Sequence, residues 1–87
     1  MSNITFSERA FDEYIYWQLN DKATLKKINA LLKDIIRNGP SEGTGKPELL
    51  KYRKAWSRRI NHEDRLVYCI GTDGTVEVQS CKGHYED

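Results

Sequence analysis

The amino-acid sequence predicts an α+β protein in which an antiparallel helix pair covers one face of an antiparallel sheet, with its elements in the order β-α-α-β-β-β. Apolar residues recur at helical spacing up to about residue 38, and beyond residue 47 they alternate with polar residues as in strands. A segment rich in glycine and proline separates the two patterns. The chain has 87 residues, of which 38% are hydrophobic, and these suffice for one core. We therefore expect a single domain over residues 1–87.

The first predicted element is a short strand over residues 3–6, where polar and apolar residues alternate. Ser7 follows, and its hydroxyl can accept hydrogen bonds from the exposed amides at the start of a helix. This helix is predicted over residues 8–19, with one broad apolar face for burial. The residues of that face are Ala10, Phe11, Tyr14, Ile15 and Trp17.

Asp21 is predicted to cap a second helix, which Gly39 and Pro40 terminate. Its apolar residues follow the i, i+3, i+4, i+7, i+8 spacing of one helical face. They are Ile28, Leu31, Leu32, Ile35 and Ile36. The stripe is long enough to pack this helix against a sheet.

Residues 38–47 are predicted to form a surface loop that leads into the sheet. Strands are predicted over residues 48–52, 55–61, 65–70 and 75–82. Thr72, Asp73 and Gly74 form the predicted hairpin turn between the last two strands, because glycine accepts positive φ. A sheet of four or five strands would then bury both helical stripes on one face.

The charges are nearly balanced but unevenly placed. Fourteen Lys and Arg residues against 13 Asp and Glu leave a net charge of +1, which does not indicate a polyanionic partner by itself. Residues 46–65 are nevertheless strongly basic. No apolar run approaches the roughly 18 residues of a membrane span, and no signal-peptide pattern begins the chain. We expect a soluble, cytoplasmic protein.

The two cysteines, Cys69 and Cys81, show no secreted disulfide pattern and no zinc-site spacing with the histidines. We predict reduced thiols, no metal site and no cofactor. His62 is predicted to be an exposed turn residue, with contact to nucleic acid as the alternative. The aromatic residues of the first helix are predicted to pack in the core and not to stack on bases.

Two features of the basic segment suggest chemistry. In Gly45-Lys46-Pro47-Glu48 an acidic residue opens a strand, either as a solvated edge residue or as a catalytic carboxylate. Arginines crowd onto the following hairpin, in Trp56-Ser57-Arg58-Arg59-Ile60 and at Arg65. They are either solvent-face residues or a phosphate-binding cluster, because guanidinium groups match phosphate geometry with forked hydrogen bonds.

The third feature is His84-Tyr85, close to the C-terminus, where a histidine is usually a mobile tail residue. A two-residue turn at positions 73 and 74 would align Cys69 with Val78, Leu66 with Cys81 and Arg65 with Lys82. His84 would then lie on the same face as Arg65. A four-residue loop preserves that arrangement and a three-residue loop breaks it. In either permitted register Cys69 and Cys81 lie on opposite faces, which disfavours a disulfide between them.

An acid, a base and a cation on one surface fit the cleavage of RNA by its own 2′-hydroxyl. The base takes the hydroxyl proton, the cation stabilises the phosphorane, and the acid protonates the departing 5′-oxygen. This chemistry requires no metal ion. We expect Glu48, Arg65 and His84 on the sheet face opposite the helices, because the helices do not need that face.

Several segments in order along nearly the whole chain resemble the YoeB (Txe) toxins of the RelE superfamily. They are Tyr16-Trp17-Gln18, Asp21-Lys22, Lys27-Ile28-Asn29, Leu32-Lys33-Asp34, Gly45-Lys46-Pro47-Glu48, Leu50-Lys51, Trp56-Ser57-Arg58-Arg59-Ile60, Arg65-Leu66-Val67-Tyr68 and His84-Tyr85. The chain departs from the usual family pattern at Leu49, where proline is common. Glu86 and Asp87 also follow the histidine–tyrosine pair at which the family tends to end.

The resemblance implies a RelE-like, microbial-ribonuclease-like fold and an mRNA interferase of a type II toxin-antitoxin system. Such toxins enter the ribosomal A site, cut the message, and are held inactive by a partly disordered antitoxin of the YefM or Axe type. The implied roles are general base for Glu48, general acid for His84, phosphorane stabilisation for Arg65 and substrate orientation or stacking for Tyr85. Lys51, Arg58 and Arg59 would contact phosphates of messenger or ribosomal RNA, and we expect Lys46 to lie at the rim of the same surface.

Two other function classes stay open: a non-enzymatic gyrase inhibitor similar to the ParE toxins, and an RNA-binding module. The joint presence of Glu48, Arg65 and His84 favours the ribonuclease, since a carboxylate near phosphate lowers the affinity of a simple binding module. Association of two copies is also left open.

Overall fold

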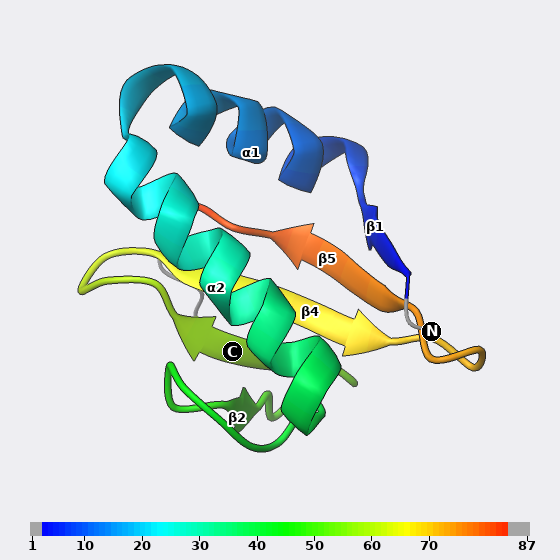
Figure 1. The fold of residues 1–87 in the computed structure, drawn as a ribbon. Coiled ribbons are helices and arrows are strands. Elements are labelled where there is room, and N and C mark those ends of the chain that lie inside the picture. The colour runs from blue at the N-terminus through cyan, green and yellow to red at the C-terminus, as the bar shows by residue number, and fades with distance from the viewer. Residues whose placement is uncertain (1–2, 84–87) are drawn as a thin grey trace.

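The structure is a computed structural model and describes residues 3–83, in which two helices pack on a five-stranded sheet (Figure 1). The elements are β1 (Ile4–Phe6), α1 (Glu8–Asn20), α2 (Lys22–Asn38), β2 (Glu48–Leu49), β3 (Trp56–Arg59), β4 (Arg65–Ile70) and β5 (Val76–Ser80). The predicted fold class is confirmed, but the observed order is β-α-α-β-β-β-β, which has one strand more after the helices than the predicted order. Within residues 3–83, neither helix has the length and apolar character needed to cross a membrane.

The predicted helix boundaries depend on side-chain caps that the structure contains. The Ser7 hydroxyl oxygen accepts a hydrogen bond from the Ala10 amide at 3.0 Å, and the Asp21 carboxylate accepts one from the Thr24 amide at 3.1 Å. Gly39, at φ +90°, caps α2 and donates its amide to the Ile35 carbonyl at 2.8 Å. The two helices therefore form a hairpin joined at Asp21.

The sheet is mixed, so the prediction of an antiparallel sheet was wrong at one edge. Its order is β1-β5-β4-β3-β2, and β1 pairs parallel with β5 while the other pairs are antiparallel. A parallel pair needs a long crossover connection, and the helical hairpin together with the rest of the chain supplies it. Figure 1 shows the first strand lying beside the last. Alternation within a strand carries no information about the direction of its neighbour.

The β4–β5 hairpin also differs from the predicted register. Ile70 pairs with Val76, and Gly71 donates its amide to the Thr75 carbonyl at 2.8 Å, which leaves a three-residue loop over 72–74. Cys69 therefore pairs with Glu77 and not with Val78. A β-bulge between Val67 and Tyr68 then shifts the register by one residue, so that Val67 pairs with Ser80 as predicted.

At the end of this hairpin the Arg65 amide donates to the Gly83 carbonyl at 3.0 Å. The predicted partner, Lys82, was therefore wrong by one residue. The predicted strands over 48–52, 55–61 and 75–82 are also shorter than expected, and β2 ends at Leu49.

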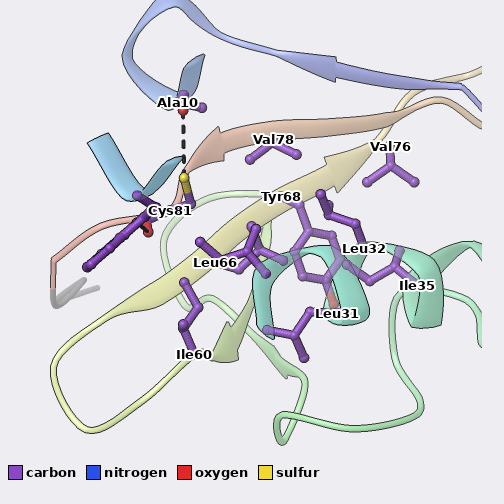
Figure 2. Close-up of a cluster of buried hydrophobic side chains, with 12 residues drawn as sticks. Ala10, Leu31, Leu32, Ile35, Ile60, Leu66, Tyr68, Val76, Val78 and Cys81 are labelled. Atoms are coloured by element: carbon purple, nitrogen blue, oxygen red, sulfur yellow. Dashed lines mark hydrogen bonds between the residues drawn. The ribbon is translucent and has the colours of Figure 1, made fainter. Parts of the chain in front are cut away.

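The core lies between the helices and one face of the sheet (Figure 2). Leu31 and Ile35 of α2 meet Leu66 and Tyr68 of β4, and all four are at most 2% exposed. Cys81 is fully buried in the same core, with its thiol 3.6 Å from the Ala10 carbonyl oxygen. Two residues of the predicted apolar helix faces are not buried: Phe11 is 52% exposed and Ile36 is 40% exposed.

Candidate functional site

The strand register places Glu48 and Arg65 on the face of the sheet that points away from the helices, called the distal face below. Glu48 pairs with Ser57, Ser57 pairs with Val67, and Val67 alternates along β4 with the core residues Leu66 and Tyr68. Arg65 has the same parity as Val67. The backbones of Glu48 and Arg65 are two strands and two residues apart, or about 12 Å. The expected face is confirmed for these two residues.

Arg59 pairs directly with Arg65 across β3 and β4, so it shares the distal face. The two cations are close because direct cross-strand neighbours have Cβ atoms about 5 Å apart. Like charges at that separation repel each other, which favours an anion between them. The pair therefore has the charge arrangement of a phosphate-binding site.

A hollow of about 350 Å³ lies where the β3–β4 hairpin meets the 39–47 loop and α2. It is called the cationic hollow, and its lining residues are Lys27, Gly45, Lys46, Arg59, Ile60, Asn61, His62 and Arg65. Four of the eight carry positive charge and none is acidic. Lys46, Arg59 and Arg65, which the sequence singled out, are thus brought together.

Gly45 lets the loop approach β3 closely. Its φ is +84°, and its carbonyl accepts the Arg59 amide at 2.7 Å. A Cβ at this position would lie 2.9 Å from the Leu31 Cδ2 atom and 3.2 Å from the Arg59 carbonyl oxygen. A side chain here would therefore push Lys46 and the start of β2 away from the hairpin.

The Arg65 guanidinium is held by the backbone of the turn over residues 61–64. Its Nη1 donates to the carbonyl of Asn61 at 2.8 Å and to that of Asp64 at 3.2 Å, and it lies 3.5 Å from the His62 carbonyl. Within residues 3–83 no group accepts a hydrogen bond from its Nη2 or Nε. One edge of the guanidinium is therefore fixed, and the described part of the chain does not occupy the other.

The prediction that Arg58 contacts RNA was wrong, because its side chain is fully buried on the core side of β3. Its Nη1 forms an ion pair with Asp34 at 2.6 Å, and its Nε donates to the Tyr68 hydroxyl at 2.9 Å. The remaining donor bonds are to backbone carbonyls of the loop that precedes β2. They are to Gly39 at 2.9 Å, Glu42 at 2.7 Å and Thr44 at 2.9 Å.

The Arg58 network also changes two pKa values. The hydrogen bond from Arg58 holds the pKa of Asp34 below its usual value, whereas burial raises the pKa of the Tyr68 hydroxyl.

Neighbouring residues of a strand point to opposite faces, so Arg58 and Arg59 could not both have lined one site. The apolar residues Trp56 and Ile60, two positions to either side of Arg58, indicate the core face and were the signal available in the sequence.

The other predicted residues are not brought into the cationic hollow. Glu48 is exposed in β2 but does not line it, and Lys51 lies in a separate hollow formed by residues 49–54. His84 and Tyr85 lie outside the described residues. His62 is an exposed turn residue, as predicted, and lines the cationic hollow. Lys27 was missed as a site residue, since a lysine on the polar side of a helix gives no sign of what it will approach.

Within residues 3–83 there is no cluster of three or more His, Cys, Asp or Glu side chains that could hold a metal ion. Cys69 is half-buried, and Cys81 is fully buried on the other side of the sheet, as predicted. Both are free thiols. Burial raises the pKa of both thiols, to about 12 for Cys81.

Comparison with known proteins agrees with the fold and extends over almost the whole chain. Residues 6–85 match the model of the YoeB-like toxin of bacterial type II toxin-antitoxin systems. Toxin YoeB of Escherichia coli K12 is 49% identical over 84 residues, which cover 94% of this chain and 98% of that protein.

Two solved structures from Staphylococcus aureus are similar. The YoeB chain in a heterotetrameric YoeB-YefM toxin-antitoxin complex has a TM-score of 0.90 and 56% identity, covering 98% of this chain and 99% of that chain. The chain of a YoeB dimer has a TM-score of 0.89 and 56% identity, covering 95% of this chain and 97% of that chain. The chain described here therefore belongs to the family of YoeB-like toxins of bacterial type II toxin-antitoxin systems.

Proposed function

We propose that this toxin is a ribosome-dependent endoribonuclease that cuts messenger RNA in the A site. The observation that carries the proposal is the pairing of Arg59 with Arg65 beside a hollow lined by four cations and no carboxylate. Such a surface suits the phosphates of an RNA strand. Glu48 lies on the same face of the sheet, within reach of a nucleotide that spans the gap of about 12 Å.

In the proposed reaction Glu48 removes the proton from the 2′-hydroxyl of the nucleotide just 5′ of the cut. The freed oxygen attacks the adjacent phosphorus, and Arg65 stabilises the negative charge of the phosphorane through the guanidinium edge that makes no hydrogen bond within residues 3–83. His84 donates a proton to the departing 5′-oxygen, and Tyr85 orients the substrate. The products are a 2′,3′-cyclic phosphate and a free 5′-hydroxyl.

Lys46 and Arg59 contribute phosphate contacts within the cationic hollow, and Lys51 extends them along the exposed segment after β2. These contacts are independent of base identity, because they are to the sugar-phosphate backbone. They would hold the messenger and ribosomal RNA in register for the cut, and would not set codon preference.

We further propose that the toxin is neutralised by a cognate antitoxin of the YefM or Axe type, since the similar Staphylococcus aureus toxin was solved in complex with YefM. A similar chain was also solved as a dimer, which supports testing self-association. The ribosome is the proposed partner in the active state.

The decisive experiment adds the purified toxin to ribosomes programmed with a defined message and maps the cleavage site. A matched message carries a single 2′-deoxyribose just 5′ of that site. We expect cleavage of the first message only, with cyclic phosphate ends, and similar binding of both because most contacts are to phosphates and stacked bases. Cleavage of the deoxy message at the normal site and rate would contradict the mechanism.

Further measurements distinguish the competing functions and test the catalytic roles of Glu48 and Arg65. Intact message together with gyrase inhibition would instead indicate a ParE-like inhibitor, and binding without either effect an RNA-binding module. Glu48→Ala should lower the cleavage rate strongly, and Arg65→Lys should keep only part of the activity because lysine lacks the guanidinium fork. Magnesium should be compared with spermidine on assembled ribosomes, so that loss of the ribosome is not mistaken for loss of chemistry.

A further inference from the structure

The C-terminal segment after β5 is held by two side chains of α1 and by one side chain of the turn that precedes β4. The Trp17 indole donates to the Cys81 carbonyl at 2.9 Å, and the Glu13 carboxylate accepts the Cys81 amide at 2.7 Å. Two residues farther on, the Asp64 carboxylate accepts the Gly83 amide at 2.7 Å. Cys81 is therefore bound to α1, and Gly83 is bound to the residue that directly precedes β4.

Gly83 is bound on both of its polar backbone groups. Its amide donates to the Asp64 carboxylate, and its carbonyl accepts the Arg65 amide at 3.0 Å. That carbonyl belongs to the planar peptide bond that joins Gly83 to His84. The φ of Gly83 is +92°, a conformation that L side chains rarely adopt, so the position suits glycine.

The Asp64 carboxylate is not needed to close its own turn. The Asn61 side-chain oxygen accepts the amides of Glu63 and Asp64, both at 2.8 Å, and the Ile60 amide donates to the Asp64 backbone carbonyl at 3.0 Å. None of these bonds uses the carboxylate of Asp64. Asp64 as a whole residue is only 9% exposed. Its carboxylate accepts a hydrogen bond from the Gly83 amide, which lies outside the turn.

The same turn holds the Arg65 guanidinium through the carbonyls of Asn61 and Asp64. One short segment thus fixes both the proposed phosphorane-stabilising cation and the residue that precedes the proposed general acid. Resting on the proposed function, we propose that Asp64 is a positioning residue for the proposed general acid His84, because its carboxylate anchors Gly83, the residue that precedes His84 in the chain.

A geometric role of this kind acts on the chemical step and not on RNA binding. Misplacement of a catalytic group by about 1 Å can cost roughly 10²-fold in rate. Asp64→Ala should therefore lower kcat by at least about 10-fold and change KM by less than about twofold. Asp64→Asn should retain most of the activity, because its amide oxygen can still accept the Gly83 amide, although a neutral acceptor forms a weaker bond.

The effect should depend on His84. In a His84→Ala background Asp64→Ala should produce no further loss of kcat, because a positioning residue has nothing left to position. Glu63→Ala is the matched control: it removes an exposed carboxylate from the same turn and should leave kcat within about twofold. Equal loss on Asp64→Ala in both backgrounds would overturn the positioning role, since it would mean that the variant only weakens the fold.

Hydrogen exchange of the Gly83 amide tests the anchor without any RNA. In the full-length toxin Asp64→Ala should accelerate exchange at Gly83 while amides of β4 and β5 keep their protection. Asp64→Asn should keep most of the Gly83 protection, and unchanged exchange in Asp64→Ala would overturn the proposal. If the wild-type toxin leaves messenger intact on ribosomes, the proposed function fails and the catalytic role of Asp64 with it, whereas a failed anchor in an active enzyme removes this inference alone.

Discussion

Arg58→Ala should destabilise the toxin strongly, although its neighbour Arg59 can be replaced at little cost in stability. Arg58 is fully buried and donates to Asp34, to the Tyr68 hydroxyl and to three backbone carbonyls. Alanine would leave these acceptors without their donor inside the protein. Arg59 is exposed, so its loss removes no buried partner.

The magnitude follows from the bonds that remain. Removing one partner of a buried ion pair typically costs about 3–5 kcal/mol. Asp34 keeps hydrogen bonds from the Thr44 amide at 3.0 Å and from the Asn38 side chain at 2.8 Å, so we expect the lower end, about 3 kcal/mol. For a chain of this size that corresponds to a fall in Tm of about 12–24 °C.

Chemical denaturation monitored by tryptophan fluorescence measures the free energy of unfolding, with Arg59→Ala as the control at less than about 0.5 kcal/mol. Arg58→Lys should lie between the wild type and Arg58→Ala, because lysine retains the charge and loses the fork. A loss below about 1 kcal/mol for Arg58→Ala would refute the assignment of Arg58 as the buried tie between the 39–45 loop and the sheet.

Four further outcomes are expected. Arg59→Ala should weaken ribosome binding and reduce the slope of log K against log salt by about 0.7, measured by binding titrations at several salt concentrations. His84→Ala should lower cleavage roughly 10²-fold while leaving the unfolding curve unchanged, and undiminished cleavage would assign the acid elsewhere. The pKa of Asp34 is lowered in the folded state, so its stabilisation is complete above its ordinary value of 3.8 and is lost as pH falls below it; Asp34→Asn should show a flatter fall of stability in acid. A thiol reagent at neutral pH should modify Cys69 slowly and Cys81 only after unfolding, and rapid labelling of two thiols in the folded protein would contradict the burial of Cys81.

Local features of the fold were predictable because they depend on neighbours in the sequence. The Ser7 and Asp21 caps, the Gly39 terminus and the strand Arg65–Ile70 all follow from short-range preferences, and the structure contains each. The parallel pairing of β1 with β5 joins segments some 70 residues apart in the chain, as at Ile4 and Val76. Nothing in the composition of either strand specifies that direction.

The candidate site shows the same difference between features set by sequence neighbours and features set by tertiary packing. Arg59, Lys46 and Arg65 could be anticipated as a cluster because they lie in one basic segment, and they share the cationic hollow. Lys27 joins them from α2, and Asp34 reaches Arg58 from the same helix. Those contacts depend on how the helix packs on the sheet, so they required the tertiary structure.

In the β4–β5 hairpin the predicted turn length was wrong, but the predicted register was correct at Val67 and Ser80. Gly74, at φ +86°, is compatible with either a two-residue or a three-residue loop, and the observed loop has three residues. That loop alone would have shifted every later residue of β5 to the opposite face. The bulge opposite Val67 and Tyr68 compensates, because the side chains of Leu66 and Cys81 are buried only if the strand returns to its former parity. Burial in the core thus overrides the loop in setting the register at Val67 and Ser80, and the register shifts by one residue again where the Arg65 amide donates to the Gly83 carbonyl.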